Sequence, residues 1–273
     1  MSSGTGEAPR VTVREVLAKK QRGERLVMVS AYDALFARLS EEGGADVILV
    51  GDSMANVILG LDSTVPVTVE QMIHHGAAVR RGASRALVVV DMPFMSYQVS
   101  TEDALRNAGR IMKETNAQAV KVEGGDEDIA ARVHAMTRAG IPVMGHIGFT
   151  PQSVNTIGGY RVQGRAPEDQ ARLVDEARRI AAAGAFSLVL ELVPAAVSKA
   201  ITAAVEIPTI GIGAGADCDG QVLVLYDLLG LNDKFRPKFL RHYAELAGDV
   251  RSAVGRFADD VRHGRYPATE HSF

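Results

Sequence analysis

The chain has 273 residues, of which 47% are hydrophobic and 23% are charged, and its formal net charge is −3 at pH 7. This length is close to the roughly 250 residues of an eight-stranded α/β barrel, and the composition suffices for a large core. Charges of both signs are mixed throughout, which gives no basic surface for nucleic acid and no polybasic arm for an anionic membrane. The single cysteine, Cys218, excludes an internal disulfide framework and a cysteine-based zinc site.

The N-terminal residues 1–10 have neither the cationic start nor the apolar core of a signal peptide, so we expect a flexible tail. No apolar stretch approaches the roughly 18 residues of a membrane span. The sequence therefore predicts a soluble, cytoplasmic protein.

Apolar runs and amphipathic stretches alternate along the chain. A short helix is expected from residue 12 to residue 20, with Thr12 as its cap and Glu15 three residues on. Eight strand-like apolar runs lie near residues 26–30, 47–51, 86–90, 119–123, 142–146, 187–191, 208–212 and 221–226. Helical spacing occurs between most of them, at residues 33–43, 68–81, 101–116, 126–139, 168–183 and 194–205. Strands that alternate with helices in this way favour a (β/α)8 barrel.

The alternative fold is an open, doubly wound sheet, which would place a glycine-rich phosphate loop after the first strand. Ala31-Tyr-Asp33 is not such a loop. No linker or break in composition indicates a second domain, so we expect one catalytic domain from residue 11 to residue 273. A helical segment is predicted from Phe235 to His263, where it covers the barrel or reaches a neighbouring subunit.

Acidic residues stand at the ends of four of the apolar runs. Asp52, Asp91 and Glu123 close three consecutive runs, and Glu191 closes a later one. Short β-branched runs are typical of buried parallel strands, and the carboxyl ends of barrel strands form the active-site face. We therefore expect these four side chains to lie at one mouth of the barrel.

Three of these carboxylates suit a divalent cation. Asp52, Asp91 and Glu123 offer hard oxygen ligands without histidine or cysteine beside them, which favours magnesium. Such an ion chelates a 2-oxo acid and stabilises the enolate that forms when the adjacent carbon loses a proton. Taken singly, each carboxylate is equally well explained by a salt bridge or a helix cap; the set favours the metal because clustered carboxylates would otherwise repel one another.

Further polar residues accompany this set. Lys121 lies two residues before Glu123 and therefore on the same face of the strand, where it would hold an anionic substrate, form a structural ion pair or form a Schiff base. Ser53 follows Asp52 directly. His146 ends the fifth run and either contacts the substrate, helps a proton move or makes a structural hydrogen bond.

Glu191 arrives on a different strand from the proposed metal ligands, which suits a base that is kept apart from the ion. We expect an apolar rim of Leu192, Val193 and Pro194 to raise the pKa of its carboxyl group, as a carboxylate base requires. The structural alternative is a helix-capping acid before Pro194.

Several longer motifs carry a resemblance to one enzyme family. They are Gly51-Asp-Ser-Met-Ala-Asn-Val57, Asp91-Met-Pro-Phe-Met-Ser-Tyr97, Val120-Lys-Val-Glu-Gly-Gly125, Gly145-His-Ile-Gly-Phe-Thr-Pro-Gln152, Gly159-Tyr-Arg-Val-Gln-Gly164, Glu191-Leu-Val-Pro194, Thr209-Ile-Gly-Ile-Gly-Ala-Gly215, Asp219-Gly-Gln-Val-Leu-Val224 and Glu270-His-Ser-Phe273. In this order they resemble the ketopantoate hydroxymethyltransferase family from about residue 11 to the C-terminus. Phe149 stands where the family pattern has leucine.

The resemblance implies a (β/α)8 barrel of the phosphoenolpyruvate/pyruvate group that uses Mg²⁺ and 5,10-methylenetetrahydrofolate. The implied substrate is 3-methyl-2-oxobutanoate and the implied product is 2-dehydropantoate, in pantothenate synthesis. Carried over to this sequence, it implies a metal site of Asp52, Asp91 and Glu123, partly through water, and an oxo-acid site that includes Ser53, Asp52, Asp91 and Lys121. It implies Glu191 as the proton acceptor, and a homo-oligomer, commonly a decamer.

Two alternative functions are a related enzyme of the same barrel group and a non-catalytic binding protein. A magnesium-dependent 2-oxo-acid lyase or mutase of the same barrel group would need the metal but no folate, and Cys218 would be its only candidate for a loop cysteine. A non-catalytic binding barrel would have lost a ligand or the base, and none is missing here. Phe94, Tyr97 and Tyr160 are the aromatic candidates for stacking on the pterin ring of a folate.

Overall fold

The computed structural model describes residues 9–273, so most of the predicted tail, residues 1–8, lies outside the described part. Its strands form a closed parallel barrel in which each strand pairs with the next one in sequence and β1 pairs with β8. They are β1 (Leu26–Ser30), β2 (Val47–Val50), β3 (Leu87–Asp91), β4 (Ala119–Glu123), β5 (Val143–Gly148), β6 (Ser187–Glu191), β7 (Thr209–Ile212) and β8 (Gly220–Val224). The predicted (β/α)8 barrel is confirmed.

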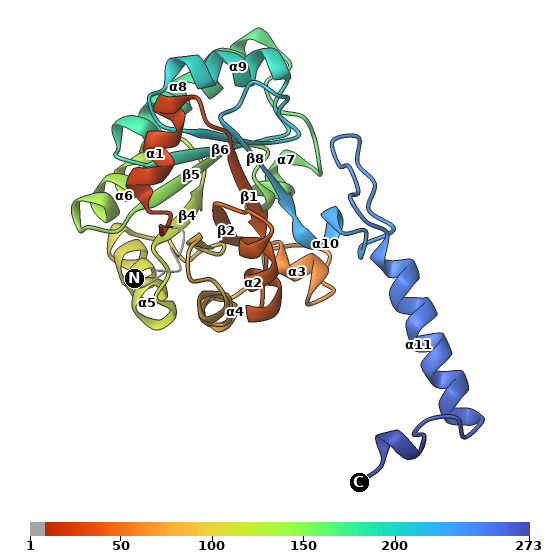
Figure 1. The fold of residues 1–273 in the computed structure, drawn as a ribbon. Coiled ribbons are helices and arrows are strands. Elements are labelled where there is room, and N and C mark those ends of the chain that lie inside the picture. The colour runs from red at the N-terminus through yellow and green to blue at the C-terminus, as the bar shows by residue number, and fades with distance from the viewer. Residues whose placement is uncertain (1–8) are drawn as a thin grey trace, which may run out of the picture. The chain divides into compact units, whose positions relative to one another are not determined.

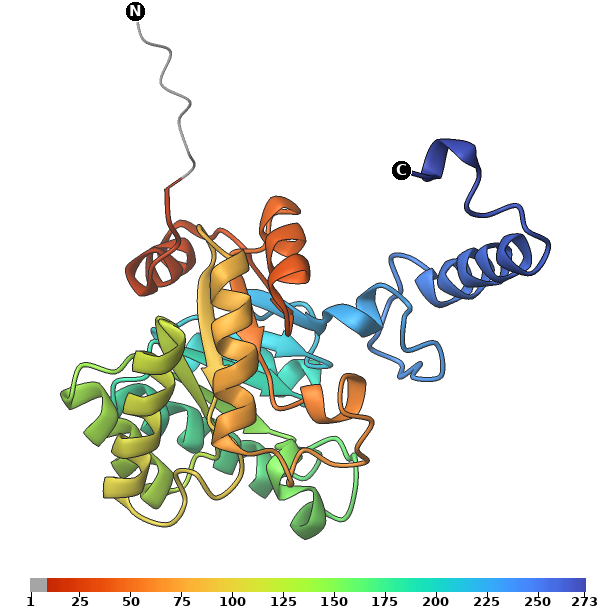
Figure 2. The ribbon, with the colours of Figure 1, turned by 90° about the horizontal axis from the view of Figure 1, so that it is seen from below.

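Helices surround the strands of the barrel, as Figures 1 and 2 show from two directions. They are α1 (Val13–Arg22), α2 (Ala34–Glu42), α4 (Val69–Gly82), α5 (Thr101–Thr115), α6 (Glu127–Arg138), α8 (Pro167–Ala182) and α9 (Ala195–Ala204). Local chemistry fixes several of their starts: the Thr12 hydroxyl caps α1, Thr68 and Gln71 form a capping box on α4, and Ser100 caps α5. No helix of the described residues is long and apolar enough to cross a membrane.

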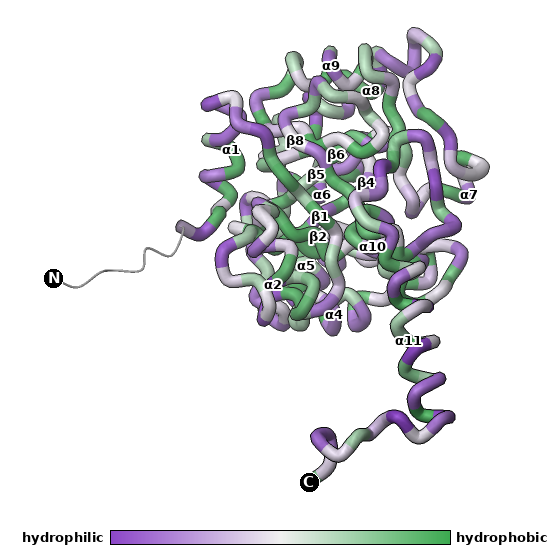
Figure 3. Tube along the Cα trace, turned by 45° about the vertical axis from the view of Figure 1, so that its right-hand side comes forward, coloured by the Kyte–Doolittle hydropathy of each residue, from purple (hydrophilic) through white to green (hydrophobic). Residues whose placement is uncertain are grey.

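Alternate residues of the strands fill the barrel. A cluster of buried side chains includes Leu87 and Val89 of β3, Ala119 of β4, Met144 of β5 and Val189 of β6. Figure 3 shows the apolar strands in the middle of the barrel and more hydrophilic residues along the outer helices. Because strand side chains alternate with a period of two, the next inward positions on these strands are occupied by the polar residues at the mouth.

The pairing register brings these polar positions together. Asp91 of β3 stands opposite Lys121 of β4, and Glu123 of β4 stands opposite His146 of β5. Gly148 of β5 stands opposite Glu191 of β6. A single end of four neighbouring strands thus carries acidic and basic side chains.

The chain divides after β8 into a second compact unit, Leu225–Phe273, which holds α10 (Leu225–Leu228), α11 (Leu246–Arg262) and the 3₁₀ turn η2 (Thr269–His271). The prediction of a helical segment from Phe235 to His263 was wrong in its first part, because α11 begins only at Leu246. The prediction of one domain from residue 11 to residue 273 stays a prediction. Short helices that the sequence pattern did not predict follow β2 and β5: α3 (Met54–Val57), η1 (Pro151–Ser153) and α7 (Val154–Ile157).

Candidate active site

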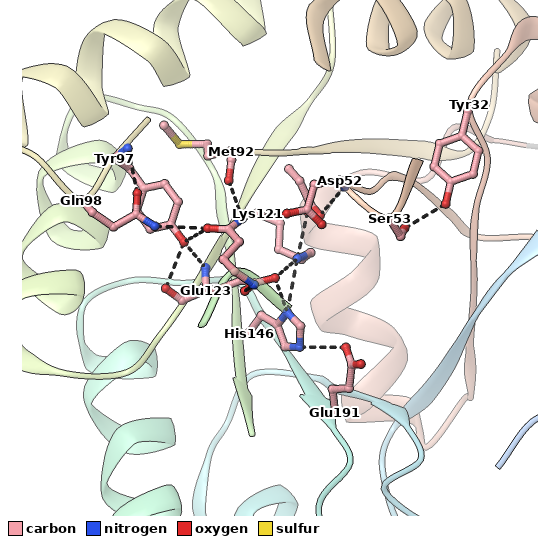
Figure 4. Close-up of polar contacts among 12 residues, drawn as sticks. Tyr32, Asp52, Ser53, Met92, Tyr97, Gln98, Lys121, Glu123, His146 and Glu191 are labelled. Carbon is pink, nitrogen blue, oxygen red and sulfur yellow. Dashed lines mark hydrogen bonds and ion pairs between the residues drawn. The ribbon is translucent and has the colours of Figure 1, made fainter. Parts of the chain in front are cut away.

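Lys121 lies among the carboxylates at the barrel mouth. Its Nζ is 3.0 Å from Asp91 Oδ1 and 3.8 Å from Glu123 Oε1, and all three side chains are at least 95% buried. The other oxygen of Asp91, Oδ2, accepts a hydrogen bond of 3.0 Å from the backbone N–H of Asp52. The two strand-end motifs that contain Asp52 and Asp91 therefore meet directly (Figure 4).

His146 stands between two carboxylates. Its Nδ1 is 3.4 Å from Glu123 Oε1, and its Nε2 is 3.3 Å from Glu191 Oε2 (Figure 4). The ring also approaches Lys121, with Nδ1 3.3 Å from Nζ. This side chain therefore joins the proposed metal ligands to the proposed base, and both of its ring nitrogens face side chains of the cluster.

Glu191 is the least buried of the site carboxylates, with 15% of its side chain exposed. The carboxylate of Glu191 has a polar partner, the His146 imidazole, where the sequence predicts an apolar rim. The physical reason is the strand direction: Glu191 continues the inward-facing positions of β6 after Val189, so its side chain points into the mouth. It does not cap α9, whose N-cap position is held by Pro194.

Ser53 lies at the edge of the cluster. Its Oγ is 2.8 Å from the hydroxyl of Tyr32, a buried residue that follows β1 (Figure 4). The short helix α3 begins directly after Ser53, so this side chain is fixed both by the turn and by Tyr32.

The electrostatics of the cluster are set by burial and by neighbouring charges. Burial, then the charges of Glu123 and Asp91, raises the pKa of Asp52 well above its ordinary value. Burial also raises the pKa of Asp91, against the opposing effect of the Lys121 ammonium. For Glu123 the contacts with His146 and Lys121 outweigh burial and lower the pKa. The carboxylates keep the pKa of Lys121 raised despite burial, so its side chain is a cation at neutral pH.

The His146 imidazole is also a cation. Burial and the Lys121 charge lower its pKa, but the contacts with Glu123 and Glu191 outweigh them and raise the pKa to about 9. Four carboxyl groups, those of Asp52, Asp91, Glu123 and Glu191, therefore face two cations, and burial opposes ionisation of Asp52 and Asp91 by raising their pKa values. A further cation in the site would favour the ionised form of these two aspartates.

Sequence reasoning missed two residues that hold this cluster. Gln152 donates hydrogen bonds from its backbone N–H to Glu123 Oε2 and from its side chain to Asp52 Oδ2. The hydroxyl of Tyr97 accepts a hydrogen bond from the backbone N–H of Glu123 and lies 2.9 Å from Gln152 Oε1. Both residues occur in the motifs quoted above. The one signal in the sequence is their place in the loops directly after β3 and β5.

A model of the family described as ketopantoate hydroxymethyltransferase matches residues 10–269. The chain belongs to this family. It is 54% identical to the 3-methyl-2-oxobutanoate hydroxymethyltransferase of Moorella thermoacetica, over 97% of this chain and 98% of the relative. It is 53% identical to the protein of the same name from Carboxydothermus hydrogenoformans, over 97% of this chain and 95% of the relative.

Solved structures with low sequence identity share the fold of this family member. A phosphonopyruvate hydrolase in complex with oxalate and Mg²⁺ aligns with a TM-score of 0.59 and 13% identity, covering 95% of this chain and 93% of that chain. A 2,3-dimethylmalate lyase of the PEP mutase/isocitrate lyase superfamily aligns with a TM-score of 0.59 and 15% identity, covering 96% and 91%. These confirm the (β/α)8 barrel fold and carry no argument for a lyase. Cys218 is buried just before β8, at the end of the barrel opposite the mouth.

The donor set fits a magnesium ion that keeps part of its water shell. Among the described residues, Asp91 Oδ1 and Glu123 Oε1 are buried and have no hydrogen-bond partner of good geometry, and a cation there would favour ionisation of Asp52 and Asp91, whose pKa values burial raises. No three acidic, histidine or cysteine side chains of the described residues converge closely enough to hold a metal by themselves. Magnesium usually takes one or two carboxylates and completes its shell with water and substrate, which suits this spacing.

The three aromatic candidates for folate stacking differ in exposure. Tyr97 is fully buried beneath Glu123, so its ring offers no face to a ligand. Phe94 is 37% exposed, and Tyr160 is 61% exposed and packs against the buried Phe149 with 4.8 Å between ring centroids. Phe94 and Tyr160 therefore remain the candidates.

Proposed function

We propose that this chain transfers a hydroxymethyl group from 5,10-methylenetetrahydrofolate to 3-methyl-2-oxobutanoate, giving 2-dehydropantoate and tetrahydrofolate. The product would serve pantothenate synthesis in the cytoplasm. The observation that carries the proposal is the family match over residues 10–269, together with a barrel mouth in which carboxylates, Lys121 and a separate Glu191 meet.

Asp52, Asp91 and Glu123 would hold magnesium, some of them through water. The bound ion supplies Lewis-acid stabilisation of negative charge on the 2-oxo acid. Lys121 would hold the carboxylate side of the substrate, because it is a buried cation whose donors are only partly used by Asp91. The Ser53 hydroxyl, oriented by Tyr32, would complete the oxo-acid site.

Glu191 would remove the proton from C3 of the oxo acid. That carbon then forms a bond to the one-carbon unit of the folate, whose bonds to the folate nitrogens break. Water supplies the hydroxyl oxygen of the product, and the nitrogens take up protons as tetrahydrofolate leaves. His146, 3.3 Å from Glu191 Oε2, would orient the base and stabilise its carboxylate form for the next turnover.

The two half-reactions can be tested separately by proton NMR of 3-methyl-2-oxobutanoate in deuterated water with protein and magnesium. We expect the C3 proton to exchange without folate, and a hydroxymethyl product to form when methylenetetrahydrofolate is added. Exchange without product would contradict folate as the donor, and no exchange would contradict the oxo acid or the site.

The assignment of the base has its own variant. Glu191→Gln should abolish C3 proton exchange while magnesium and oxo-acid binding, measured by calorimetry, stay close to the native values. Glu168→Gln, an exposed residue in the first turn of α8, is the matched control and should exchange at the native rate. Undiminished exchange in Glu191→Gln would remove Glu191 from this role.

The family resemblance also supports a homo-oligomer, with a decamer as the expected form. In the C-terminal unit, α11 presents an apolar stripe of Val250, Val254, Phe257 and Val261, each between 48% and 60% exposed. Their spacing of four, three and four residues places them on one face of the helix, where Phe257 contacts Tyr266 but all four side chains stay about half exposed. We propose this face as a contact between subunits.

A further inference from the structure

Gln152 is hydrogen-bonded through both ends of its side-chain amide. Its side-chain Nε2 donates to Asp52 Oδ2 at 2.9 Å and to the backbone carbonyl of Met92 at 3.0 Å. Its Oε1 lies 2.9 Å from the Tyr97 hydroxyl and 3.1 Å from Gln98 Nε2, which donates to it. Both amide hydrogens and both oxygen lone pairs are therefore engaged, and the amide can adopt only this orientation.

Gln152 contacts two of the three carboxylates, one through its side chain and one through its backbone. The side chain reaches Asp52, and the backbone N–H of the same residue donates to Glu123 Oε2 at 3.0 Å. Asp52 follows β2, Glu123 ends β4, and Gln152 lies in η1 after β5, so one residue connects the ends of three strands. Gln152 is 5% exposed, and bulk water cannot replace these donors without local opening.

We propose that Gln152 is the positioning residue of the metal site: it fixes the positions of Asp52 and Glu123, which would hold magnesium. This inference rests on the proposed function, because it concerns the same site. A neutral amide suits the task. The side-chain amide donates to Asp52 while the backbone N–H of the same residue donates to Glu123. These donors offset the repulsion between the two carboxylates and leave their negative charge available to a cation, which a lysine or arginine in place of Gln152 would neutralise.

The neighbouring residues extend the same support outward. Tyr97, fully buried, orients Gln152 Oε1 and at the same time accepts from the backbone N–H of Glu123. Outer partners of metal ligands fix the ligand geometry, and their loss typically lowers metal affinity 10–100-fold. Gln152 does not touch the reacting carbon in this scheme, so its effect should fall on metal affinity and not on the chemical step.

The test is calorimetric titration of the substrate-free protein with MgCl₂ alone. Gln152→Met keeps the length of the side chain and removes its donors, and should raise the Kd for magnesium about 10–100-fold. Gln152→Asn keeps the amide but is one methylene shorter, so it cannot span from η1 to Asp52; it should weaken binding in the same direction and guards against misfolding of the first variant.

A matched control separates positioning from general loss of stability. Gln118, just before β4 at the opposite end of the barrel, accepts a hydrogen bond of 2.9 Å from Val88 N–H. Gln118→Met should lower the denaturation midpoint but leave the magnesium Kd within twofold of the native value. In the full reaction, Gln152→Met should raise the magnesium concentration needed for half-maximal rate, with kcat at saturating magnesium reduced less than threefold.

The outcomes are distinct. Folded Gln152→Met and Gln152→Asn proteins that bind magnesium within twofold of the native protein would overturn the role of Gln152 and leave the proposed function intact. A low kcat that saturating magnesium does not restore would also overturn it. If the native protein binds no magnesium in this titration, the proposed metal site is wrong.

Discussion

Two aspartate–lysine pairs stand at opposite ends of the barrel and differ in what surrounds them. At the mouth, Asp91 is 3.0 Å from Lys121, in the midst of further carboxylates. At the other end, Asp46 is 2.8 Å from Lys19, and its second oxygen accepts a hydrogen bond from Val27 N–H. At the bottom of the barrel, both carboxylate oxygens of Asp46 have a partner within the protein. The pair at the mouth belongs to a cluster in which carboxyl groups outnumber the cations, as we expect for proposed metal ligands.

This contrast leads to a prediction for Asp91→Asn. The substitution removes a proposed ligand and leaves Lys121 with weaker partners, so we expect magnesium binding to weaken about 10–100-fold, with a parallel loss of oxo-acid binding. Calorimetry with magnesium and then with 3-methyl-2-oxobutanoate measures both. Asp46→Asn is the matched control and should lose stability but keep both affinities. Native affinities in Asp91→Asn would exclude it from the site.

At the level of residues, the sequence predicted that the charged members of the cluster and Ser53 lie at one barrel mouth, but it did not predict the contacts of Gln152 and Tyr97. Asp52, Asp91 and Glu123 stand out because a carboxylate that ends an apolar run has no place in the hydrophobic pattern. Gln152 and Tyr97 lie in the segments after β5 and β3. Polar and aromatic residues are common in such segments, so neither residue stands out in the sequence. Their importance comes from hydrogen bonds to residues 26–100 positions away in sequence, which no local pattern encodes.

Among the strands, the pairing of β5 with β6 depends on one glycine. Gly148 has a φ of +96°, and a Cβ atom there would lie 2.4 Å from the backbone oxygen of Glu191. The carbonyl of Glu191 also accepts a hydrogen bond of 2.8 Å from Phe149 N–H. The absence of a side chain at residue 148 thus allows β6 to deliver Glu191 to His146.

Gly148→Ala should therefore impair both stability and catalysis. The left-handed backbone alone costs about 1–3 kcal/mol, and the clash must also move the end of β6. We expect C3 proton exchange to fall at least tenfold, measured by NMR alongside urea denaturation. Gly140→Ala is a suitable control, because Gly140 has a φ of +86° but open space around its Cβ position. Equal exchange rates in the two variants would show that the approach of β6 does not limit Glu191.

Helix α2 is tied to β3 by a single carboxylate. Glu41 accepts hydrogen bonds from the backbone N–H groups of Arg85 and Ala86, both at 2.6 Å, and from the Ser84 hydroxyl at 2.7 Å. Burial raises the pKa of Glu41, but the hydrogen bonds from Ala86, Ser84 and Arg85 outweigh it and lower the pKa below its ordinary value. The ionised form of Glu41 therefore stabilises the fold.

The lowered pKa fixes the pH dependence of Glu41→Gln. The stabilisation is fully present above the unfolded-state pKa, about 4.3, and is lost as the pH falls through the lower folded-state pKa. We expect the variant to lose about 2 kcal/mol of unfolding free energy at pH 7 and the difference to shrink below about pH 4. Urea denaturation at several pH values measures this. Glu42→Gln, an exposed neighbour paired with Arg38, should change stability by less than about 1 kcal/mol. A difference that is constant with pH would contradict this account.

The one wrong element boundary has a physical cause. The predicted helix from Phe235 contains Pro237, which lacks a backbone N–H and favours a turn. Tyr243 N–H and Leu246 N–H instead donate to the carbonyls of Leu228 and Leu229, so the chain folds back on the end of α10 before α11 starts. The strands were predicted almost to the residue, because buried parallel strands are the least ambiguous apolar runs in an alternating pattern.

At the scale of the whole molecule, the exposed apolar face of α11 is a candidate for contact with another molecule. Four exposed apolar side chains form a continuous stripe along α11: Val250, Val254, Phe257 and Val261. Single exposed apolar residues are common on protein surfaces, but contiguous apolar patches mark contacts with other molecules. The occupant that we propose is a second copy of the chain.

Val254→Asp should therefore reduce the assembly. Val254 is 60% exposed and lies in the middle of the stripe, so burying a carboxylate there would cost several kcal/mol in the interface while leaving the free subunit folded. We expect a lower molar mass by size-exclusion chromatography with light scattering, with an unchanged circular dichroism spectrum. Ser252→Asp introduces the same charge on the opposite face of α11 and should keep the native mass. A native mass in Val254→Asp would show that this face makes no subunit contact, and a mass equal to one chain in the native protein would remove the oligomer itself.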